Sequence, residues 1–570
     1  MVSYGHDRKR PHTEITLNAS GLGSANARSE KPLVLIGSAT GGQPKVPVEL
    51  TNFAQAREFF RGGELLDAIE MAWNPSPNTR GAGKIFAIRA DDAKQATKAS
   101  GGLTVTSKLF GADANEIQYS LTDNAVTKSK RFSVFYTKER YEQVYDNIGN
   151  IFSIQYKGAL AYGSVTVEVD ATTKLATKLI LKAGADKQGA TEVRSYTLGT
   201  GVYQNVNVLI NDISNLPDFT VVTNSLGGNK NVETQFLDAV VEVDTKAPAT
   251  AKMITAIGAD IVNQTDTDPY VKVTYDPKTA IPATIQVTNL AGGSTTAPAE
   301  SWASLFTAVA DLGAYYIVPL TDKEAIHGEL SQFLRDESGA GNQLRGFVGG
   351  GLKDTFDKLK ARQAGLRNPR VSLVGNSGTR RMSDGRVYNY PAYMGAALIG
   401  GIASGIGVGE PVTYKKLNVE ALDIKFTGDQ LDQLDGAGVV MTEFVRTRQS
   451  SYFRIVSDPT TYNTSTEPVQ NRISLGEVSD FLTTELRTML DEQFIGTRIR
   501  NTSASIIKNA VESFLDQQKN VDGLIVDYNP DDVQVVITGN SARINITVQP
   551  ARGLDDITVG INYVDNKLTA

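Results

Sequence analysis

The chain has 570 residues, of which 41% are hydrophobic and 21% charged, and its formal net charge at pH 7 is −6. This composition is typical of a folded globular protein with room for roughly three or four domains. The mild acidity gives no reason to expect a nucleic-acid-binding protein, which would carry a concentrated basic surface. The absence of cysteine excludes disulfides, thiolate metal sites and cysteine nucleophiles.

Residues 1–30 form a polar leader that lacks the apolar stretch of a secretion signal. Its basic run, Arg8–Arg10, is typical of a solvated tail. Between Thr13 and Asn18, apolar and polar residues alternate as they do in a β-strand. We expect no partner strand nearby, so this strand must be covered or must pair with another chain.

From residue 31 to about residue 100 the pattern alternates between strand and helix. Short apolar runs predict buried strands at Leu33–Ile36 and Ile85–Ile88. Two stretches between them have helical spacing of apolar residues, namely Phe53, Ala56, Phe59 and Phe60, and then Leu65, Leu66, Ile69 and Trp73. This alternation predicts a small α/β layer.

Between residues 101 and 295, short β-type runs replace the helical periodicity. They are separated by turns rich in Gly, Asn, Asp and Lys, and they include Leu103–Thr106, Phe132–Tyr136, Val165–Val169, Lys178–Leu181, Val271–Tyr275 and Thr284–Val287. The spacing predicts one or two β-sandwich or barrel modules. We interpret Asp244–Lys252 as a linker between them.

Strands separated by helices return after residue 295. Buried strands are expected at Tyr315–Leu320, Leu344–Val348 and Val371–Val374, with a helix at Lys353–Gln363 before the last of them. Repeated units of this length predict a largely parallel sheet flanked by helices.

Residues 387–409 contain no charged residue, a length that could cross a membrane. Six glycines dilute the hydrophobicity of this stretch, however, and insertion requires a predominantly apolar segment. We therefore predict a buried helix from about Pro391 to Ser404, whose small residues allow close backbone packing.

The C-terminal part is predicted to be a compact α+β unit. Ser474 and Glu477 have the spacing of a capping box before a long helix, and a second helix follows Thr502. Val533–Thr538 and Arg543–Val548 predict a hairpin, with Gly539 and Asn540 at its turn.

One more alternating segment, Ile557–Val564, follows the loop Pro550–Asp556. Like Thr13–Asn18, it is a strand without an evident partner in its own sheet. Two such ends suggest a subunit of an assembly.

Catalytic chemistry has little support. The chain has three histidines, His6, His12 and His327, and the first two lie in the leader, so we expect no metal site. Gly375–Gly378 resembles the surroundings of a serine nucleophile, with Ser377 as nucleophile and His327 as its only available base. The spacing of a hydrolase elbow is missing, so a structural turn is the favoured interpretation.

Two glycine-rich loops follow predicted strands, as phosphate-binding loops do. Gly37–Gly42 lacks the ending and the spacing of nucleotide-binding loops, and Gly349–Gly351 could place an anion at a helix N-terminus. Tight strand-to-helix turns are the favoured interpretation of both, and no cofactor is expected.

Several long sequence segments connect the chain to a known family. They are PLVLIGSATGG and ELTNFAQAREFFRGGELLDAIEMAW near the start, YYIVPLTDKEAIHGEL and NPRVSLVGNSGT in the middle, and EFVRTRQSSYFRIV, EQFIGTRIRNTSASIIK and DDVQVVITGNSARINITVQP toward the end. Through them the chain resembles the tail sheath proteins of contractile-tailed bacteriophages, in particular the large sheath proteins of phages that infect Gram-positive bacteria.

The resemblance implies a multidomain fold of the α+β and α/β classes, with an inner α/β core formed by the N-terminal and C-terminal regions. On this basis the segments are an N-terminal arm (1–30), an α/β part of the core (31–100), a β-rich insertion (101–295), an α/β sheath domain (296–456), a C-terminal α+β domain (457–552) and a C-terminal arm (553–570).

In this family both arms add strands to the C-terminal sheet of a neighbouring subunit. The residues that match the arms are Thr13, Glu14, Ile15, Thr16, Leu17, Asn18, Ile557, Thr558, Val559, Gly560, Ile561, Asn562 and Tyr563. The hairpin expected to accept them carries Val533, Val535, Ile537, Ile544, Ile546 and Val548. The C-terminal domain also contacts the tail tube in this family, and the basic candidates for that contact are Arg487, Arg498, Arg500 and Lys508.

The implied function is mechanical. Copies of the chain would form stacked hexameric rings in a helical sheath, which contracts and drives the tube through the host envelope. The implied partners are the chain itself, the tail tube protein, and the baseplate and tail terminator proteins, without direct nucleic-acid contact or stable membrane insertion. The sheath would be assembled in the host cytoplasm and belong to the virion. A sheath of a non-phage contractile system, or a hydrolase, are the alternatives.

Overall fold

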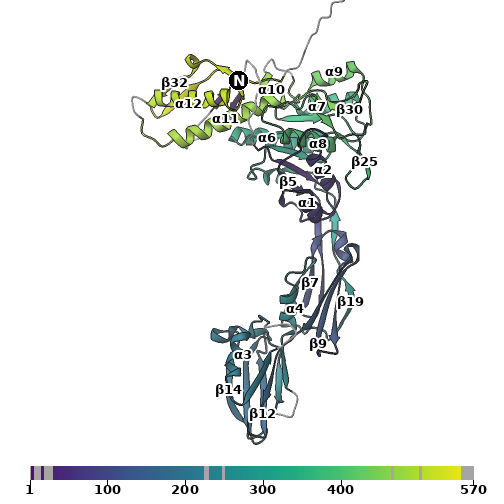
Figure 1. Ribbon diagram of the computed structural model, residues 1–570, viewed down its shortest axis with the longest axis vertical. Coiled ribbons are helices and arrows are strands. Elements are labelled where there is room, and N and C mark those ends of the chain that lie inside the picture. The colour runs from purple at the N-terminus through teal and green to yellow at the C-terminus, as the bar shows by residue number, and fades with distance from the viewer. Residues whose placement is uncertain are drawn as a thin grey trace, which may run out of the picture. The chain divides into compact units, whose positions relative to one another are not determined.

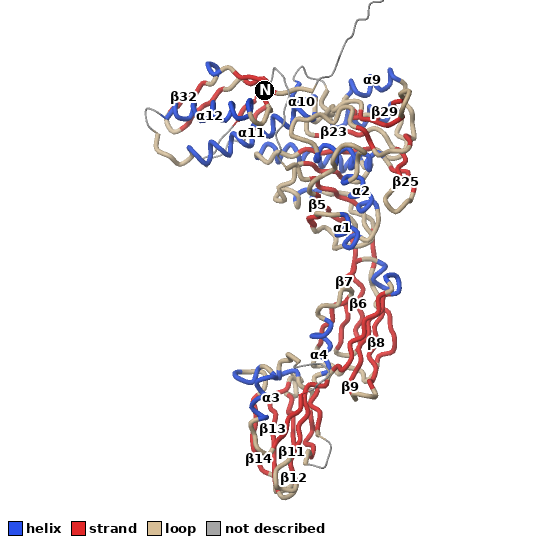
Figure 2. Tube along the Cα trace, viewed as in Figure 1, coloured by secondary structure: helices blue, strands red, loops and turns tan. Residues whose placement is uncertain are grey.

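The computed structural model describes residues 2–4, 15–17, 30–223, 230–246, 251–463, 468–499 and 503–553. The chain divides into two compact units, of which unit 1 comprises Met1–Asp92 and Ala297–Ala570 and unit 2 comprises Ala93–Thr296 (Figure 1). Unit 1 mixes helices and strands, whereas unit 2 consists mainly of strands (Figure 2). The multidomain class with both α and β elements is thus confirmed.

A seven-stranded sheet forms the centre of unit 1. Its order is β28 (Val439–Val440), β23 (Val371–Val374), β22 (Arg345–Gly349), β21 (Tyr316–Pro319), β3 (Leu33–Gly37), β5 (Ile85–Arg89) and β4 (Pro47–Leu50). All neighbours are parallel except β4, which is antiparallel to β5. The largely parallel sheet expected from the sequence is therefore present. Parallel strands buried on both faces read as continuous apolar runs, which is why β3, β5, β21, β22 and β23 could be predicted, whereas the edge strands β4 and β28 were not.

Helices cover both faces of this sheet. Leu33 and Leu35 face a core shared with α1 (Phe53–Phe60), α2 (Glu64–Trp73) and α8 (Ala392–Gly405). Val34 and Ile36 face a second core, shared with α5 (Ala303–Thr307), α6 (Glu324–Ala340), α7 (Phe356–Leu366) and α9 (Gly428–Ala437).

Helix α8 is the buried helix predicted at Pro391–Ser404. A Cβ added at Gly401 would lie 2.3 Å from the backbone oxygen of Ala72, so α8 and α2 approach each other at backbone distance. No helix in the described part of the chain is long and apolar enough to cross a membrane.

Two small sheets complete this part of unit 1. The first has the order β25 (Val387–Tyr390), β24 (Gly378–Arg381) and β27 (Ala421–Leu422), and the second has the order β26 (Lys416–Leu417), β30 (Ser451–Ile455) and β29 (Thr442–Arg446).

The C-terminal part of unit 1 has its own core. Helices α11 (Ile473–Phe494) and α12 (Ser503–Asn520) pack with strands β31 (Ile525–Tyr528), β32 (Gln534–Thr538), β33 (Ser541–Asn545) and β34 (Val548–Pro550). The short helices α10 (Pro468–Asn471) and η5 (Pro530–Asp532) precede α11 and β32.

Unit 2 contains two β modules, each with a separate core. In the first, sheets β10-β9-β8-β19 and β18-β7-β6-β20 enclose Tyr119, Phe132 and Val271. In the second, sheets β15-β11-β17 and β14-β13-β12-β16 enclose Phe152 and Leu179.

The strands of unit 2 are β6 (Asp92–Ser100), β7 (Leu103–Phe110), β8 (Gln118–Asn124), β9 (Ser129–Tyr136), β10 (Tyr141–Ile148), β11 (Asn150–Tyr156), β12 (Tyr162–Val169), β13 (Ala176–Gly184), β14 (Thr191–Thr197), β15 (Phe219–Thr223), β16 (Val240–Asp244), β17 (Lys252–Thr255), β18 (Val271–Tyr275), β19 (Ile285–Asn289) and β20 (Ser294–Thr296). Its helices are η1 (Ala112–Glu116), η2 (Thr137–Glu139), η3 (Gly201–Gln204), α3 (Val206–Ser214), η4 (Thr234–Phe236) and α4 (Ile257–Thr265).

The linker predicted at Asp244–Lys252 is wrong as a boundary between modules. Strands β16 and β17, on either side of it, both belong to the second module and carry its core residues Val240 and Ile254. The stretch instead joins the two sheets of one module. Polar, proline-containing composition marks a loop, but it does not distinguish a loop within a module from one between modules.

Candidate assembly interface

The predicted N-terminal arm strand is present in part. Residues Ile15–Leu17 form β2, which pairs antiparallel with β1 (Val2–Tyr4) in the same chain, with Tyr4 opposite Ile15. The assumption that no partner strand lies nearby is therefore wrong. A strand of three residues is too short to show a clear alternation in the sequence, which is why β1 was missed. Thr13, Glu14 and Asn18 lie outside the described residues.

The predicted acceptor hairpin is formed by β32 and β33, whose register places Thr538 opposite Ser541 across the turn. Val533 is buried, and the remaining candidates are partly buried against the core of α11 and α12, namely Val535, Ile537, Ile544, Ile546 and Val548. Arg543–Val548 is not one strand, as had been expected. Strand β33 ends at Asn545, and Val548 begins β34, which pairs with β31 instead of β32.

Among the described residues, both sheets of this region have two strands, in the orders β31-β34 and β32-β33, and α12 packs against β31 and β32. A two-stranded sheet is marginally stable alone, and within the described part of the chain each of these strands has one edge without a neighbour. These edges have the backbone geometry to accept further strands. The C-terminal arm residues Ile557, Thr558, Val559, Gly560, Ile561, Asn562 and Tyr563 lie outside the described residues.

Three of the four candidates for tube contact lie among the described residues. Arg487 is half-buried, and its guanidinium donates to the backbone oxygen of Gly341 at 3.4 Å. Lys508 donates to the backbone oxygen of Pro530 at 2.9 Å. Arg498 is exposed in the loop after α11, and Arg500 lies outside the described residues.

A buried ionic cluster joins α11 to the central sheet, and the sequence had not indicated it. We call it the edge cluster. Its cations and tyrosines stand at or just before the first residues of four adjacent parallel strands, whereas its acids lie one turn apart on α11. Its members are Lys31, Tyr315, Tyr316, Arg345, Arg370, Glu477 and Asp480.

Glu477 is paired on several sides. Its two carboxylate oxygens each lie 2.9 Å from Nζ of Lys31, and it also accepts hydrogen bonds from the hydroxyl of Tyr316 and from the backbone N–H of Gly409, the latter at 2.8 Å. The side chains of Lys31 and Glu477 are 3% and 2% exposed, so water cannot replace these partners. Burial lowers the pKa of Lys31, and the charge of Glu477 opposes that shift.

Asp480 accepts hydrogen bonds from Arg345 at 2.7 Å, from Arg370 at 2.9 Å and from the hydroxyl of Tyr315 at 2.9 Å. Burial by itself would raise the pKa of Asp480, but the two guanidinium groups outweigh burial and lower it. Burial, followed by the charge of Asp480, raises the pKa of Tyr315. The two guanidinium groups thus hold Asp480 ionised, and Tyr315 is its neutral hydrogen-bond donor.

The capping box predicted at Ser474 and Glu477 is wrong. Helix α11 begins at Ile473 with Arg472 as its N-cap residue and without a side-chain cap. Ser474 instead donates its hydroxyl to Asp458 at 2.6 Å, and Glu477 binds Lys31. Both side chains satisfy distant partners in the fold, which local spacing cannot reveal.

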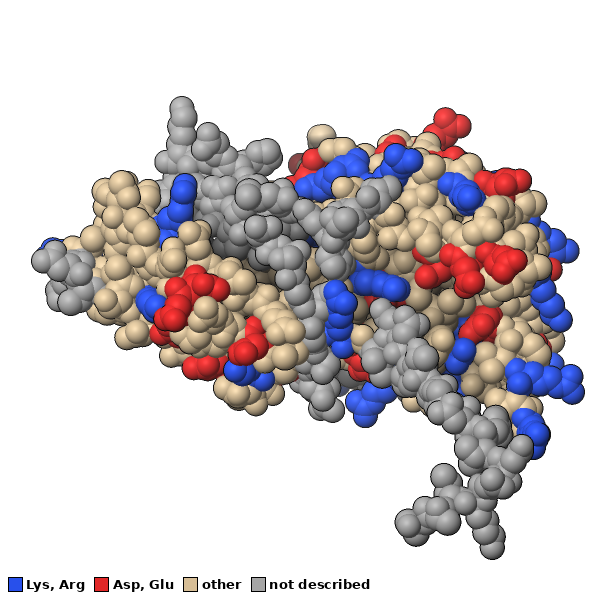
Figure 3. Space-filling model, turned by 90° about the horizontal axis from the view of Figure 1, so that it is seen from above, with Lys and Arg blue, Asp and Glu red and all other residues tan. Residues whose placement is uncertain are grey.

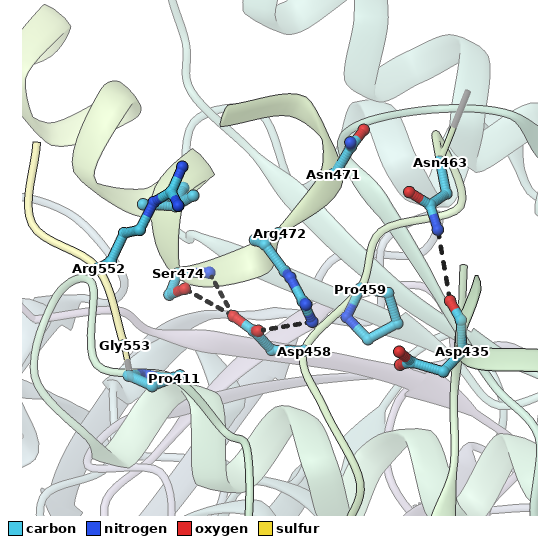
Figure 4. A pocket seen from close by; sticks show the side chains of 11 residues that line it. Pro411, Asp435, Asp458, Pro459, Asn463, Asn471, Arg472, Ser474, Arg552 and Gly553 are labelled. Carbon is cyan, nitrogen blue, oxygen red and sulfur yellow. Dashed lines mark hydrogen bonds and ion pairs between the residues drawn. The ribbon is translucent and has the colours of Figure 1, made fainter. Parts of the chain in front are cut away.

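A pocket of about 220 Å³ lies at the same end of α11 (Figure 4). Asp458 accepts from Ser474 at its floor and pairs with Arg472, and Arg552 and Gly553 form another wall. Gly553 is the last described residue of the chain.

The residues of the hydrolase alternative have other partners. The hydroxyl of Ser377 donates to Asp423 at 2.7 Å, while Nε2 of His327 lies 2.8 Å from the backbone oxygen of Thr321. These contacts do not join the two residues as a nucleophile and its base.

The two glycine loops are structural turns. Asp354 occupies the space above Gly350, where an added Cβ would lie 1.9 Å from its carboxylate, and Arg362 pairs with Asp354 at 2.7 Å. An anion there would meet a like charge. The N–H of Ala39, in the other loop, donates to Asp91 at 2.9 Å. No group of three or more potential metal ligands occurs among the residues that the structure describes.

On the face shown in Figure 3, basic and acidic side chains are interspersed over the described surface.

Two relatives match the chain over nearly its full length. The protein assigned as tail sheath protein in Enterococcus phage phiEF24C is 47% identical, covering 98% of this chain and 98% of the relative. The tail sheath protein of Staphylococcus phage Twort is 43% identical, covering 99% and 98%. The chain belongs to the tail sheath proteins of phages that infect Gram-positive bacteria. It is therefore a structural subunit of the virion.

Solved structures support the same fold. The sheath tail protein from Desulfitobacterium hafniense superposes with a TM-score of 0.54 at 14% identity, covering 92% of this sheath protein and 94% of that chain. The sheath tail protein from Listeria innocua gives a TM-score of 0.53 at 13% identity, covering 93% and 94%. No family model matches the chain.

Proposed function

We propose that this sheath protein polymerises into stacked hexameric rings around a tail tube, and that the resulting helical sheath contracts to drive the tube through the host envelope. The observation that carries the proposal is the pair of two-stranded sheets on α12, β31-β34 and β32-β33, whose edges can take further strands. The arms at residues 1–30 and 553–570 supply those strands to neighbouring copies.

Both arms are needed, because each one alone is marginal. A six-residue strand makes about four backbone hydrogen bonds worth roughly 0.5 to 1.5 kcal/mol each, while ordering it costs about 1 to 2 kcal/mol per residue. Burial of apolar side chains such as Ile15 and Leu17 would contribute roughly 1.5 to 3 kcal/mol each. Repetition through a closed lattice then makes weak contacts durable.

Contraction would release free energy that is stored during assembly in the host cytoplasm. The assembled subunits would have two packings of unequal free energy, and the baseplate would trigger passage from one to the other. The remaining partners are the tube and tail terminator proteins. The near-full-length relatives come from phages, which favours a phage tail over another contractile system.

Deletion of residues 1–20 tests the proposal. The truncated chain loses β1 and β2 but should stay folded, because the described core residues of unit 1 begin at Leu33, and it should form no tubes. Electron microscopy of the purified protein provides the measurement. A full-length control with Arg8 and Lys9 changed to alanine should polymerise like the parent chain, and normal tubes from the deletion variant would refute the arm pairing.

The exposed Arg498 and its neighbour in sequence Arg500 are proposed to face the tube, with Arg487 and Lys508 as the weaker candidates because both have partners within the subunit. Changing Arg498 to glutamate should weaken assembly around tubes and leave tube-free polymerisation unaltered. Equal co-sedimentation of the variant and parent sheaths with tubes would contradict this contact.

A further inference from the structure

The chain enters the described core of unit 1 beside α11. Lys31 is the first buried side chain after the leader, and besides Glu477 it contacts the backbone oxygen of Gly407 at 3.2 Å. The hydroxyl of Ser404 donates to the backbone oxygen of Lys31. Two separate segments, α11 and the end of α8 with the loop after it, therefore hold the root of the N-terminal arm.

The chain leaves the core at the same end of this helix. The N–H of Ala551 donates to the backbone oxygen of Leu524 at 2.9 Å, and Gly553 packs so closely on Pro411 that an added Cβ would lie 3.0 Å from Cγ of the proline. Arg552 lines the pocket in which Ser474 and Arg472 also lie (Figure 4).

One short segment connects the two roots. The oxygen of Gly407 accepts from Lys31, the N–H of Gly409 donates to Glu477, and Pro411 contacts Gly553. Lys31 and Gly553, near the two ends of the described core, thus both lie beside the first turns of α11, although they are more than 500 residues apart in the chain.

The buried carboxylates of Glu477 and Asp480 allow only one placement of α11 on the sheet. An apolar helix face tolerates small sliding and rotation, because dispersion contacts are not directional. A buried carboxylate with fixed donors on several sides does not, since a displaced carboxylate leaves buried charges unpaired. Glu477 and Asp480 together bind donors that precede four neighbouring strands, so α11 has one register on the sheet edge.

We propose that Glu477 and Asp480 are positioning residues for assembly, which fix the register of α11 and thereby the places at which both arms leave the subunit. This inference rests on the proposed arm exchange. The cluster contributes orientation, whereas neutral side chains of similar volume could supply much of the stability.

Two variants separate orientation from stability. Glu477→Gln leaves Lys31 buried without its counter-charge, and it should lower the midpoint of thermal unfolding by roughly 5 to 10 °C. The double variant Lys31→Met with Glu477→Gln removes both charges and should regain most of that loss. If it regains stability but still fails to build regular tubes, orientation is the function of the pair.

A distance measurement in the free subunit provides a readout that a merely stabilising role would not change. The chain has no cysteine, so Ala364→Cys on α7 and Asn509→Cys on α12, both at exposed positions, can carry spin labels at unique sites. The parent chain should give one narrow distance distribution and the double variant a broader one. The exposed pair Arg381 and Glu420, which lies outside α12 and its two sheets, is changed to methionine and glutamine as the control and should change neither the distances nor the tubes.

The outcomes distinguish this inference from the proposed function. An unchanged distance distribution, or regular tubes from the Lys31→Met and Glu477→Gln double variant, would overturn the positioning role while leaving arm exchange intact. Failure of the parent chain to form tubes would instead count against the proposed function. The distance distributions would still decide whether Glu477 sets the register of α11.

Discussion

Helices α8 and α11 both pack on the seven-stranded sheet, but they do so with opposite chemistry. Helix α8 lies on a face of the sheet and buries alanine, leucine, isoleucine and glycine, with Gly401 against the backbone of α2. Helix α11 crosses the edge at which the parallel strands begin, and it buries Glu477 and Asp480 there.

The difference follows from what each surface of a sheet presents. A face presents side chains, which are apolar when the sheet is covered on both sides. The edge where strands begin presents backbone groups and the residues that lead into each strand, here Lys31, Arg345 and Arg370. A helix that covers such an edge must bring hydrogen-bond acceptors. Helix α11 brings Glu477 and Asp480 there, whereas its apolar residues Val478, Leu482, Leu486 and Leu490 belong to the core shared with α12.

The largest effect is expected at the edge. Asp480→Leu would leave Arg345 and Arg370 buried without their shared carboxylate and should lower the free energy of unfolding of unit 1 by about 3 to 5 kcal/mol. Urea denaturation provides the measurement. Glu485→Leu, at an exposed position of the same helix, should change stability by less than about 0.5 kcal/mol. A similar small loss at position 480 would mean that the edge cluster contributes little.

A smaller loss is expected on the face. Gly401→Ala would place a Cβ 2.3 Å from the backbone oxygen of Ala72 and force α2 and α8 apart, at a cost of about 1 to 3 kcal/mol. Gly436→Ala in α9, where no atom lies within 4 Å of the added Cβ, should instead stabilise the protein by about 0.4 to 1 kcal/mol. Equal effects of the two substitutions would show that the close approach of α8 and α2 relaxes freely.

The faces and the edge of the sheet also differ in whether the titratable side chains buried there are neutral or charged. His327, on the face helix α6, is held neutral because burial lowers its pKa to about 4. In the unfolded chain His327 is protonated below about pH 6.5, whereas in the folded chain it stays neutral until about pH 4. The free energy of unfolding therefore decreases as the pH falls from about 6.5 to 4. Between pH 7 and pH 5.5 the loss in the free energy of unfolding should be on the order of 1 kcal/mol. The variant His327→Gln should lack this component in urea denaturation, and an unchanged pH dependence would contradict it.

The elements that the sequence predicted are those with a local signal. Leu33–Ile36 and Val371–Val374 are continuous apolar runs, and Gly539 with Asn540 marks the turn between β32 and β33. The helix at Pro391–Ser404 could be told from a membrane span because its glycines dilute its hydrophobicity. In each case the residues of the element itself, and not distant partners, determine its structure.

The errors have the opposite origin. Ser474 and Glu477 have the spacing of a capping box, but their side chains bind Asp458 and Lys31 instead of the backbone at the start of α11. Both partners are distant in the chain. The break between β33 and β34 arises because the chain changes partner from β32 to β31. Neither partner can be recognised from a stretch of neighbouring residues.

The sequence by itself determined the class of the fold, five strands of the central sheet (β3, β5, β21, β22 and β23), the buried α8 and, through long matching segments, membership in the tail sheath proteins. Periodicity and composition predict elements from a few neighbouring residues, and the family is recognised from matches along the whole chain. Only the tertiary structure decided that Lys31, Arg345 and Arg370 meet Glu477 and Asp480, because parallel strands bring their starting residues to one edge from positions hundreds of residues apart. Buried charges are stable only where such partners converge, and convergence is a property of the fold.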